Sequence, residues 1–116
     1  MLRPAVLALA ALLAAPGGAD AQPRQFCADN RGGFVASVII TQADSNGRDT
    51  KVPLGQDRHL ETTRTLCVTT PNPHGVFVRW NVVVFGVLQG AGCTTHLRQG
   101  RAVVWGTVFD PICYVE

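Results

Sequence analysis

The longest run of β-branched and aromatic residues covers positions 76–87, and it constrains the fold more than any other stretch. β-branched side chains are stiff against the preceding turn of a helix, whereas they fit a pleated strand well. Alternate side chains of a strand point to opposite faces. One face of this run is uniformly large and apolar, with Val76, Val78, Trp80, Val82 and Val84. The pattern predicts a long strand with one face in the core of a sheet.

The opposite face of the same run is apolar at its ends and polar in its middle. Here Arg79 and Asn81 lie between Phe77 and Val83. An arginine beside aromatic side chains on an open sheet face can stack on a ligand or a sugar ring. The alternative is that the methylene groups of Arg79 cover apolar surface while its charge stays in water. This polar middle is the first place to look for a ligand site.

A second long strand is expected at 101–109, and Arg101, Trp105 and Thr107 share one of its faces. If this strand paired with 76–87, these side chains would be cross-strand neighbours of Arg79 and Asn81. The candidate ligand-binding residues are therefore Arg79, Asn81, Arg101 and Trp105.

The first 21 residues have the parts of a secretory signal peptide. Arg3 gives a basic start, an apolar stretch follows at 5–15, and Ala19-Asp20-Ala21 supplies small residues for cleavage. As a helix the apolar stretch would span about 16 Å, about half of a bilayer core, which argues against a membrane anchor. We expect cleavage after Ala21, which leaves one secreted or periplasmic domain at 22–116 with no transmembrane segment.

Four cysteines lie in that domain. An even number in a small exported domain indicates two disulfides. A zinc site is the less favoured alternative, because no two of these cysteines have the close spacing of structural zinc ligands. Among the possible pairings we favour Cys27–Cys67 and Cys93–Cys113, since each would hold a weak segment against a neighbouring strand.

Alternating patterns separated by turn signals recur along the rest of the domain. Besides 76–87 and 101–109, strands are expected at 26–28, 34–41, 48–52, 57–70 and 112–115. Pro53 is expected to end an edge strand, 54–56 to form a loop, and 93–99 has no assignment. Six to seven strands without helical periodicity predict an all-β fold. We expect a small antiparallel β-sandwich of immunoglobulin-like or Greek-key type, stabilised by disulfides, with a small β-barrel as the alternative.

Few side chains are arranged for catalysis or metal binding. Asp57, His59 and Glu61 would share one face of a strand, where they could bind a metal or act as acid and base. A charged face on an exposed edge strand explains them more simply. His74 and His96 are interpreted as surface residues, and no G-x-S-x-G motif is present. The sequence therefore favours a protein that is not an enzyme and has no cofactor.

The formal net charge is +2, and the arginines are spread along the chain. The basic stripe typical of nucleic-acid binding is absent, so no nucleic-acid partner is expected. The sequence predicts an exported, disulfide-stabilised binding module whose partner is an unknown protein, a carbohydrate or an envelope component. A membrane-active, toxin-like protein is the alternative, and a small hydrolase is the second alternative.

Overall fold

The computed structural model describes residues 22–84 and 87–116, and it describes side chains throughout these ranges except at 87–91. The expected signal peptide and residues 85–86 of the central run lie outside the described residues. The described part of the chain forms eight strands and no helix. The strands are β1 (Arg24–Asn30), β2 (Val35–Ala43), β3 (Asp49–Leu60), β4 (Thr65–Thr70), β5 (Val76–Val84), β6 (Val87–Leu97), β7 (Arg101–Thr107) and β8 (Asp110–Val115).

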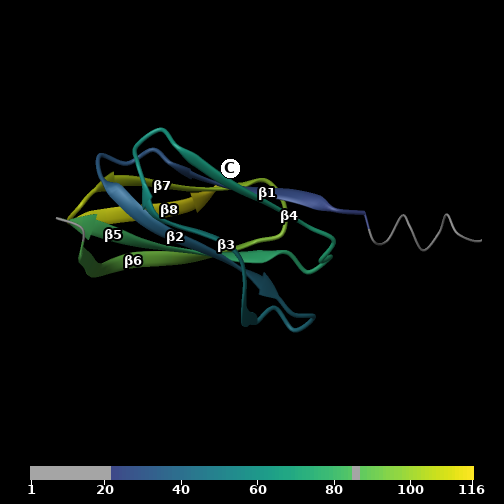
Figure 1. The fold of residues 1–116 in the computed structure, drawn as a ribbon. Helices are drawn as coiled ribbons and strands as arrows, with labels where there is room; N and C mark the ends of the chain where they lie inside the picture. The colour runs from purple at the N-terminus through teal and green to yellow at the C-terminus, as the bar shows by residue number, and fades with distance from the viewer. Residues whose placement is uncertain (1–21, 85–86) are drawn as a thin grey trace, which may run out of the picture.

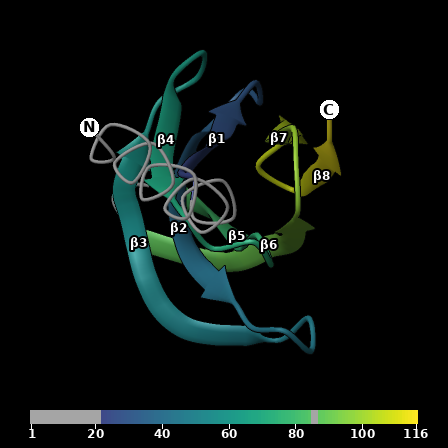
Figure 2. The same ribbon diagram turned by 90° about the vertical axis from the view of Figure 1, so that its right-hand side faces the viewer.

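The strands form two four-stranded sheets that face each other (Figures 1 and 2). The first sheet has the order β4-β1-β7-β8, and the second has the order β3-β2-β5-β6. The predicted all-β sandwich is therefore confirmed. Neighbouring strands are antiparallel except β1 and β7, which run parallel. This pair departs from the antiparallel pattern of the expected sandwich, and parallel strands of this kind require a long connection, which the chain between β1 and β7 supplies.

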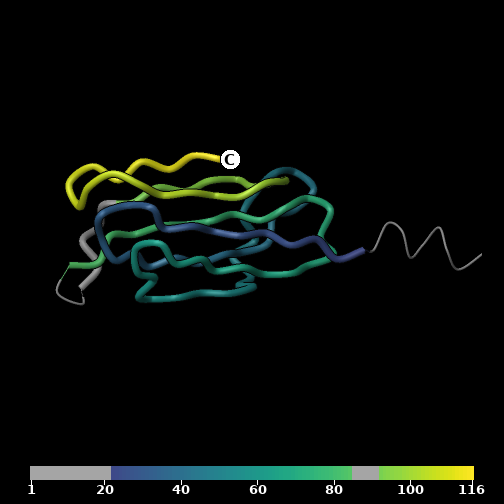
Figure 3. The backbone as a smooth tube through the Cα atoms, turned by 90° about the horizontal axis from the view of Figure 1, so that it is seen from above, coloured from purple at the N-terminus to yellow at the C-terminus, as the bar shows by residue number. Residues whose placement is uncertain are grey.

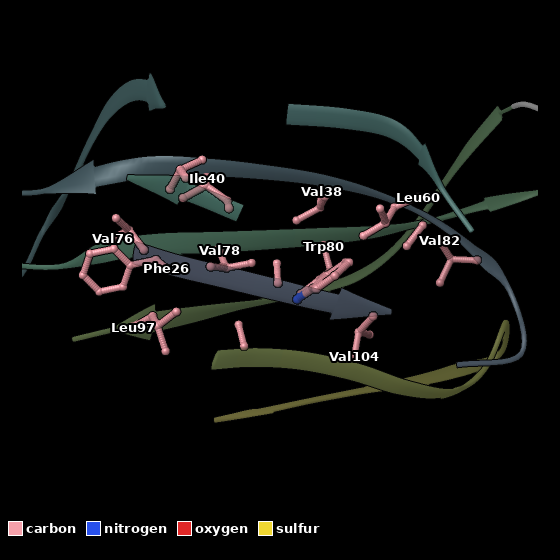
Figure 4. Packing of buried hydrophobic residues seen from close by; sticks show 14 of the residues in the cluster. Phe26, Val38, Ile40, Leu60, Val76, Val78, Trp80, Val82, Leu97 and Val104 are labelled. Carbon is pink, nitrogen blue, oxygen red and sulfur yellow. The ribbon is translucent and has the colours of Figure 1, made fainter. Parts of the chain in front are cut away.

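The core lies between the two sheets and is centred on the inner face of β5 (Figure 4). Val76, Val78, Trp80 and Val82 are at most 1% exposed, as the apolar alternation predicts. β2 adds its own alternating inner face, and β1 and β7 close the core from the first sheet. Their contributions are Ala36, Val38 and Ile40 from β2, Phe26 and Ala28 from β1, and Ala102 and Val104 from β7.

β3 is longer than the sequence predicts. It continues through Pro53 and through 54–56, which was expected to be a loop. Proline is tolerated because β3 is at the edge of the second sheet, and the pairing with β2 shifts register around Thr41, the partner of Pro53. The expected strand at 57–70 is in fact divided between the end of β3 and β4.

β6 occupies most of the segment that the sequence left unassigned. The part of β6 at 93–97 is polar apart from Cys93 and Leu97, and Leu97 is the fully buried residue of β6 among the side chains described. With so little apolar alternation, nothing in the local sequence distinguishes this strand from a loop. β6 accounts for the difference between the seven expected ranges and the eight observed strands, because the divided 57–70 segment adds none: its first part joins the expected strand at 48–52 to form β3, and its last part is β4.

Two disulfides join the strands, and they are the two pairs that the sequence favours. Cys27 of β1 and Cys67 of β4 are direct partners in the strand register, with Cα atoms 4.1 Å apart. Cys93 of β6 and Cys113 of β8 have Cα atoms 6.1 Å apart, and their bond links the edge strands of opposite sheets. Disulfides of this kind are typical of proteins that fold in an oxidising compartment.

Reduction of the disulfides should lower the melting temperature by more than about 10 °C. The bridges span 40 and 20 residues, so each removes about 3–4 kcal/mol of chain entropy from the unfolded state. Thermal unfolding followed by circular dichroism, with and without reductant, measures the shift. The double variants Cys27→Ser/Cys67→Ser and Cys93→Ser/Cys113→Ser separate the two contributions. An unchanged melt of the fully reduced protein would contradict this account of its stability.

Candidate functional site

The four candidate ligand-binding residues lie on two different sheets. Arg79 and Asn81 belong to β5 in the second sheet, whereas Arg101 and Trp105 belong to β7 in the first sheet. β5 pairs with β2 and β6, and β7 pairs with β1 and β8. The expected cross-strand contact between the two pairs is therefore wrong, because β6 follows β5 in the same sheet and the chain then crosses to the other sheet before β7. The four residues cannot form a single site.

On the second sheet, Arg79 and Asn81 lie in two adjacent rows of side chains that cross the outer face. In one row the register pairs Arg79 with Ile39 of β2, which in turn pairs with Gln56 of β3. In the next row Asn81 pairs with Ser37 of β2 and Gly92 of β6. Side chains that are direct partners across strands lie within reach of one another. The outer face thus combines one guanidinium group with two carboxamides, a hydroxyl group and an apolar side chain.

A hollow of about 430 Å³ lies over these rows. Ser37 and Gly92 are the cross-strand neighbours of Asn81, and both are small, so no bulky side chain stands beside Asn81 on the outer face. A Cβ atom at Gly92 would lie 2.1 Å from the carbonyl oxygen of Trp80, so no side chain can be placed there without moving the backbone. The residues that line the hollow are Ser37, Val38, Ile39, Gln56, Arg58, His59, Arg79, Asn81 and Val83.

Arg58 and His59 of β3 complete the rim of this hollow, and an irregularity in β3 explains why two adjacent residues can both do so. Ala36 pairs with Leu60 and Val38 pairs with Asp57, so β3 has one residue more than β2 between these two pairs. Such a bulge bends the strand and changes the direction of its side chains. Both Arg58 and the adjacent His59 consequently line the hollow, which the alternation of a regular strand would not allow.

Arg79 is held in place by Asp49 at the start of β3. Its guanidinium group donates a hydrogen bond to the carboxylate. Asp49 also accepts hydrogen bonds from the hydroxyl of Thr41 at 2.7 Å and from the backbone N–H of Lys51 at 2.8 Å. Burial raises the pKa of Asp49, but these three hydrogen bonds outweigh it, so its pKa lies below the usual value. Asp49 therefore stays ionised and fixes the direction of the Arg79 side chain.

The candidate metal ligands Asp57, His59 and Glu61 do not share a strand face, because β3 ends at Leu60. A carboxylate oxygen of Asp57 accepts a hydrogen bond from the backbone N–H of His59 at 2.8 Å. Within residues 22–84 and 87–116, no three His, Cys, Asp or Glu side chains are arranged to hold a metal ion.

The two other histidines contact each other at the edge of the second sheet. The rings of His96 and Phe77 stack with their centroids 4.5 Å apart. Nε2 of His96 lies 3.1 Å from the carbonyl oxygen of His74. The stacking gives His96 a packing role in joining β5 to β6, whereas the exposed His74 takes part through its backbone carbonyl group.

On the first sheet, Arg101 belongs to an ion-pair cluster centred on Asp29. The carboxylate of Asp29, of which 7% is exposed, accepts hydrogen bonds from Arg101 at 2.7 Å, Arg31 at 3.1 Å and Thr65 at 2.6 Å. Burial raises the pKa of Asp29, and the hydrogen bonds from Thr65 and Arg101 lower it further than burial raises it. Arg31 also forms a two-bonded ion pair with Glu116. The surroundings of Arg101 thus explain it as a structural residue.

Trp105 lies on the hairpin of β7 and β8, which carries most of the exposed large apolar side chains among the described residues. Trp105 pairs with Ile112 across the two strands, and they are 48% and 39% exposed. Phe109, in the turn of the hairpin, is 92% exposed. Tyr114 continues the apolar surface along the same face of β8, and the exposed Val115 lies on the opposite face of the strand. We call Trp105, Phe109 and Ile112 the hairpin patch.

Of the three side chains in the hairpin patch, Trp105 is a predicted ligand-binding residue, whereas Phe109 and Ile112 are not. The available signal was an aromatic residue two positions before the Pro111 that interrupts the strand pattern, where a turn was to be expected. Figures 1 and 3 show that the hairpin turn lies at the opposite end of the sandwich from the start of β1.

Comparison with known protein-family models and with characterised proteins gives no match. Among solved structures, the membrane-binding domain of pneumolysin is similar, with a TM-score of 0.53 and 19% sequence identity over 82% of this chain and 96% of that domain. Full-length pneumolysin is similar with a TM-score of 0.51 and 18% identity. The match covers 81% of this chain and 23% of full-length pneumolysin. At this identity the likeness shows a shared fold.

Acid should destabilise the protein through Asp29 and Asp49. Both carboxyl groups have lower pKa values in the folded protein than in the unfolded chain. Their stabilisation is therefore fully present above the unfolded pKa, and it is lost as the pH falls below about 4 through the folded pKa. Urea midpoints between pH 7 and pH 2 should fall steeply in the wild type and less steeply in Asp29→Asn/Asp49→Asn. The exposed Asp110→Asn is the control and should follow the wild type. Equal acid slopes in all three proteins would be inconsistent with these ion pairs.

Proposed function

We propose that this protein is an exported β-sandwich module that docks onto a membrane surface through the hairpin patch. The observation that carries the proposal is the 92% exposure of Phe109 at the turn of the β7–β8 hairpin, with Trp105 and Ile112 exposed on the strands behind it. A contiguous exposed apolar patch on a small protein marks an interaction surface.

The chemistry of the hairpin patch suits the boundary between lipid and water. Tryptophan and phenylalanine supply large apolar area, and the indole N–H of Trp105 can stay hydrated at the level of the headgroups. Moving one phenylalanine side chain from water into an apolar environment contributes about 1.5–3 kcal/mol. The three side chains of the hairpin patch together provide this apolar contribution. Because the paired strands of the hairpin already hold them in place, docking costs little conformational entropy. The described residues include no helix long and apolar enough to cross a membrane.

The similarity to a solved domain of pneumolysin supports the same function. That domain is described as membrane-binding, and the match covers 96% of it. The low identity means that the residues that contact lipid have to be identified in this chain itself. The hairpin patch is the described surface whose composition agrees best with that role.

Substitution of Phe109 by serine should weaken binding to phosphatidylcholine vesicles at least about tenfold, because one large apolar contact is lost. Co-sedimentation with vesicles measures the affinity. Val52→Ser is the matched control, since Val52 is 48% exposed but lies on β3 in the other sheet. Equal binding by Phe109→Ser and the wild type would exclude the hairpin patch as the docking surface.

The two tryptophans of the chain give an independent measurement of the docking geometry. Trp105 is 48% exposed and Trp80 is 1% exposed, so vesicles should shift the fluorescence of Trp105 to shorter wavelength and leave that of Trp80 unchanged. Trp105→Phe should abolish the shift. Entrapped dye that stays inside the vesicles would indicate docking alone, whereas its release would indicate the membrane-active alternative.

A further inference from the structure

We propose that the hollow on the outer face of the second sheet binds a hydroxylated organic anion, such as a sugar acid or a sugar phosphate. The hollow is formed by β2, β3 and β5 and shares no residue with the hairpin patch on β7 and β8. The two proposals therefore rest on different residues and can fail separately.

The charge of the hollow selects an anion. Two guanidinium groups, those of Arg58 and Arg79, line it, and no carboxylate is among the described residues of its lining. A guanidinium group presents several N–H donors in a plane that matches the oxygens of a carboxylate or a phosphate. Asp49 engages one nitrogen of Arg79 from outside the lining and so orients the guanidinium group before a ligand arrives.

The remaining lining selects hydroxyl groups on the same ligand. Ser37, Asn81 and Gln56 lie in the two adjacent rows and offer both donors and acceptors of hydrogen bonds. Ile39 and Val83 supply an apolar floor on which the C–H face of a sugar ring can pack. A simple inorganic anion would use the arginines and leave these other groups without a role.

The size of the hollow agrees with a ligand of this class. Pockets for small molecules have volumes of about 300–1,000 Å³ and combine an apolar surface with a few well-placed polar groups. At about 430 Å³ the hollow is in the lower part of this range. Its lining comes from three paired strands, and the bulge in β3 shapes its rim, so the backbone of the sheet forms the hollow.

Titration of the protein with glucuronate or glucose 6-phosphate, followed by amide NMR spectra, tests the proposal. Both anions should shift the amide signals of β2, β3 and β5 around the hollow, and glucose should not, because it lacks the charge. Inorganic phosphate should bind more weakly than glucose 6-phosphate, because it lacks the hydroxyl groups. Equal affinity for glucose and glucuronate, or for phosphate and glucose 6-phosphate, would overturn the assignment.

Arg58→Gln and Arg79→Gln should each weaken binding of the sugar anions at least about tenfold, because each removes a hydrogen bond between charged groups. Arg101→Gln is the matched control, since Arg101 also pairs with an aspartate but lies on the other sheet. Arg58 is exposed, and no ion pair is observed for it among the described residues, so Arg58→Gln should fold even if Arg79→Gln does not. Wild-type affinity in Arg58→Gln, or a loss in Arg101→Gln equal to that in the hollow variants, would overturn the proposal.

The source of the anion is decided by competition. Vesicles containing phosphatidylglycerol, which carries a phosphate and hydroxyl groups, are added to the complex with glucuronate in the background of Phe109→Ser. Displacement of glucuronate would assign the hollow to a lipid headgroup, and retention would assign it to a soluble or polymeric sugar acid. Either result supports the anion site, provided that Arg58→Gln removes the binding that is observed.

Discussion

The packing of Trp80 between the two sheets is the interaction on which the rest of the structure depends. Trp80 is the largest fully buried side chain, and it lies in the middle of β5 with buried valines before and after it on the same face. Burial of an indole removes about 150–250 Å² from water, worth about 4–6 kcal/mol. The described residues give its N–H no hydrogen-bond acceptor, at a cost of about 1–3 kcal/mol. The apolar contribution is the larger, so the residue stabilises the core despite the unpaired donor.

Because one face of β5 is buried in the core, the polar side chains of this strand can meet a ligand only on its other face. Because Trp80 and its neighbours must face the first sheet, Arg79 and Asn81 must face outward. Ser37 and Gly92 flank Asn81 with small residues, and Arg58 faces the same surface as Gln56, two positions before it in β3. The polar hollow is thus the reverse side of the strand that forms the core.

The sequence could predict the features that depend on local pattern. The strand at 76–84 follows from its apolar alternation, and the two disulfides follow the pairing that brings weak segments against neighbours. Features that depend on the arrangement of strands could not be predicted. Arg101 and Trp105 were expected beside Arg79, but the chain changes sheet between β6 and β7. The hollow depends on a bulge and on cross-strand neighbours, neither of which leaves a signal in the order of residues.

Each outer face has an ion pair between an arginine and an aspartate, but the surroundings of the two pairs differ. This difference explains why only the second sheet is proposed to have an anion site. On the first sheet Asp29 accepts hydrogen bonds from two arginines and a threonine, and Arg31 is also bound to Glu116. The carboxylates and guanidinium groups of the first sheet therefore neutralise each other's charges. On the second sheet Asp49 binds Arg79 from one side, while the other side borders a hollow with a second arginine, Arg58, in its lining. Positive charge next to open volume attracts an anion, whereas positive charge already matched by carboxylates leaves little net attraction for a further anion.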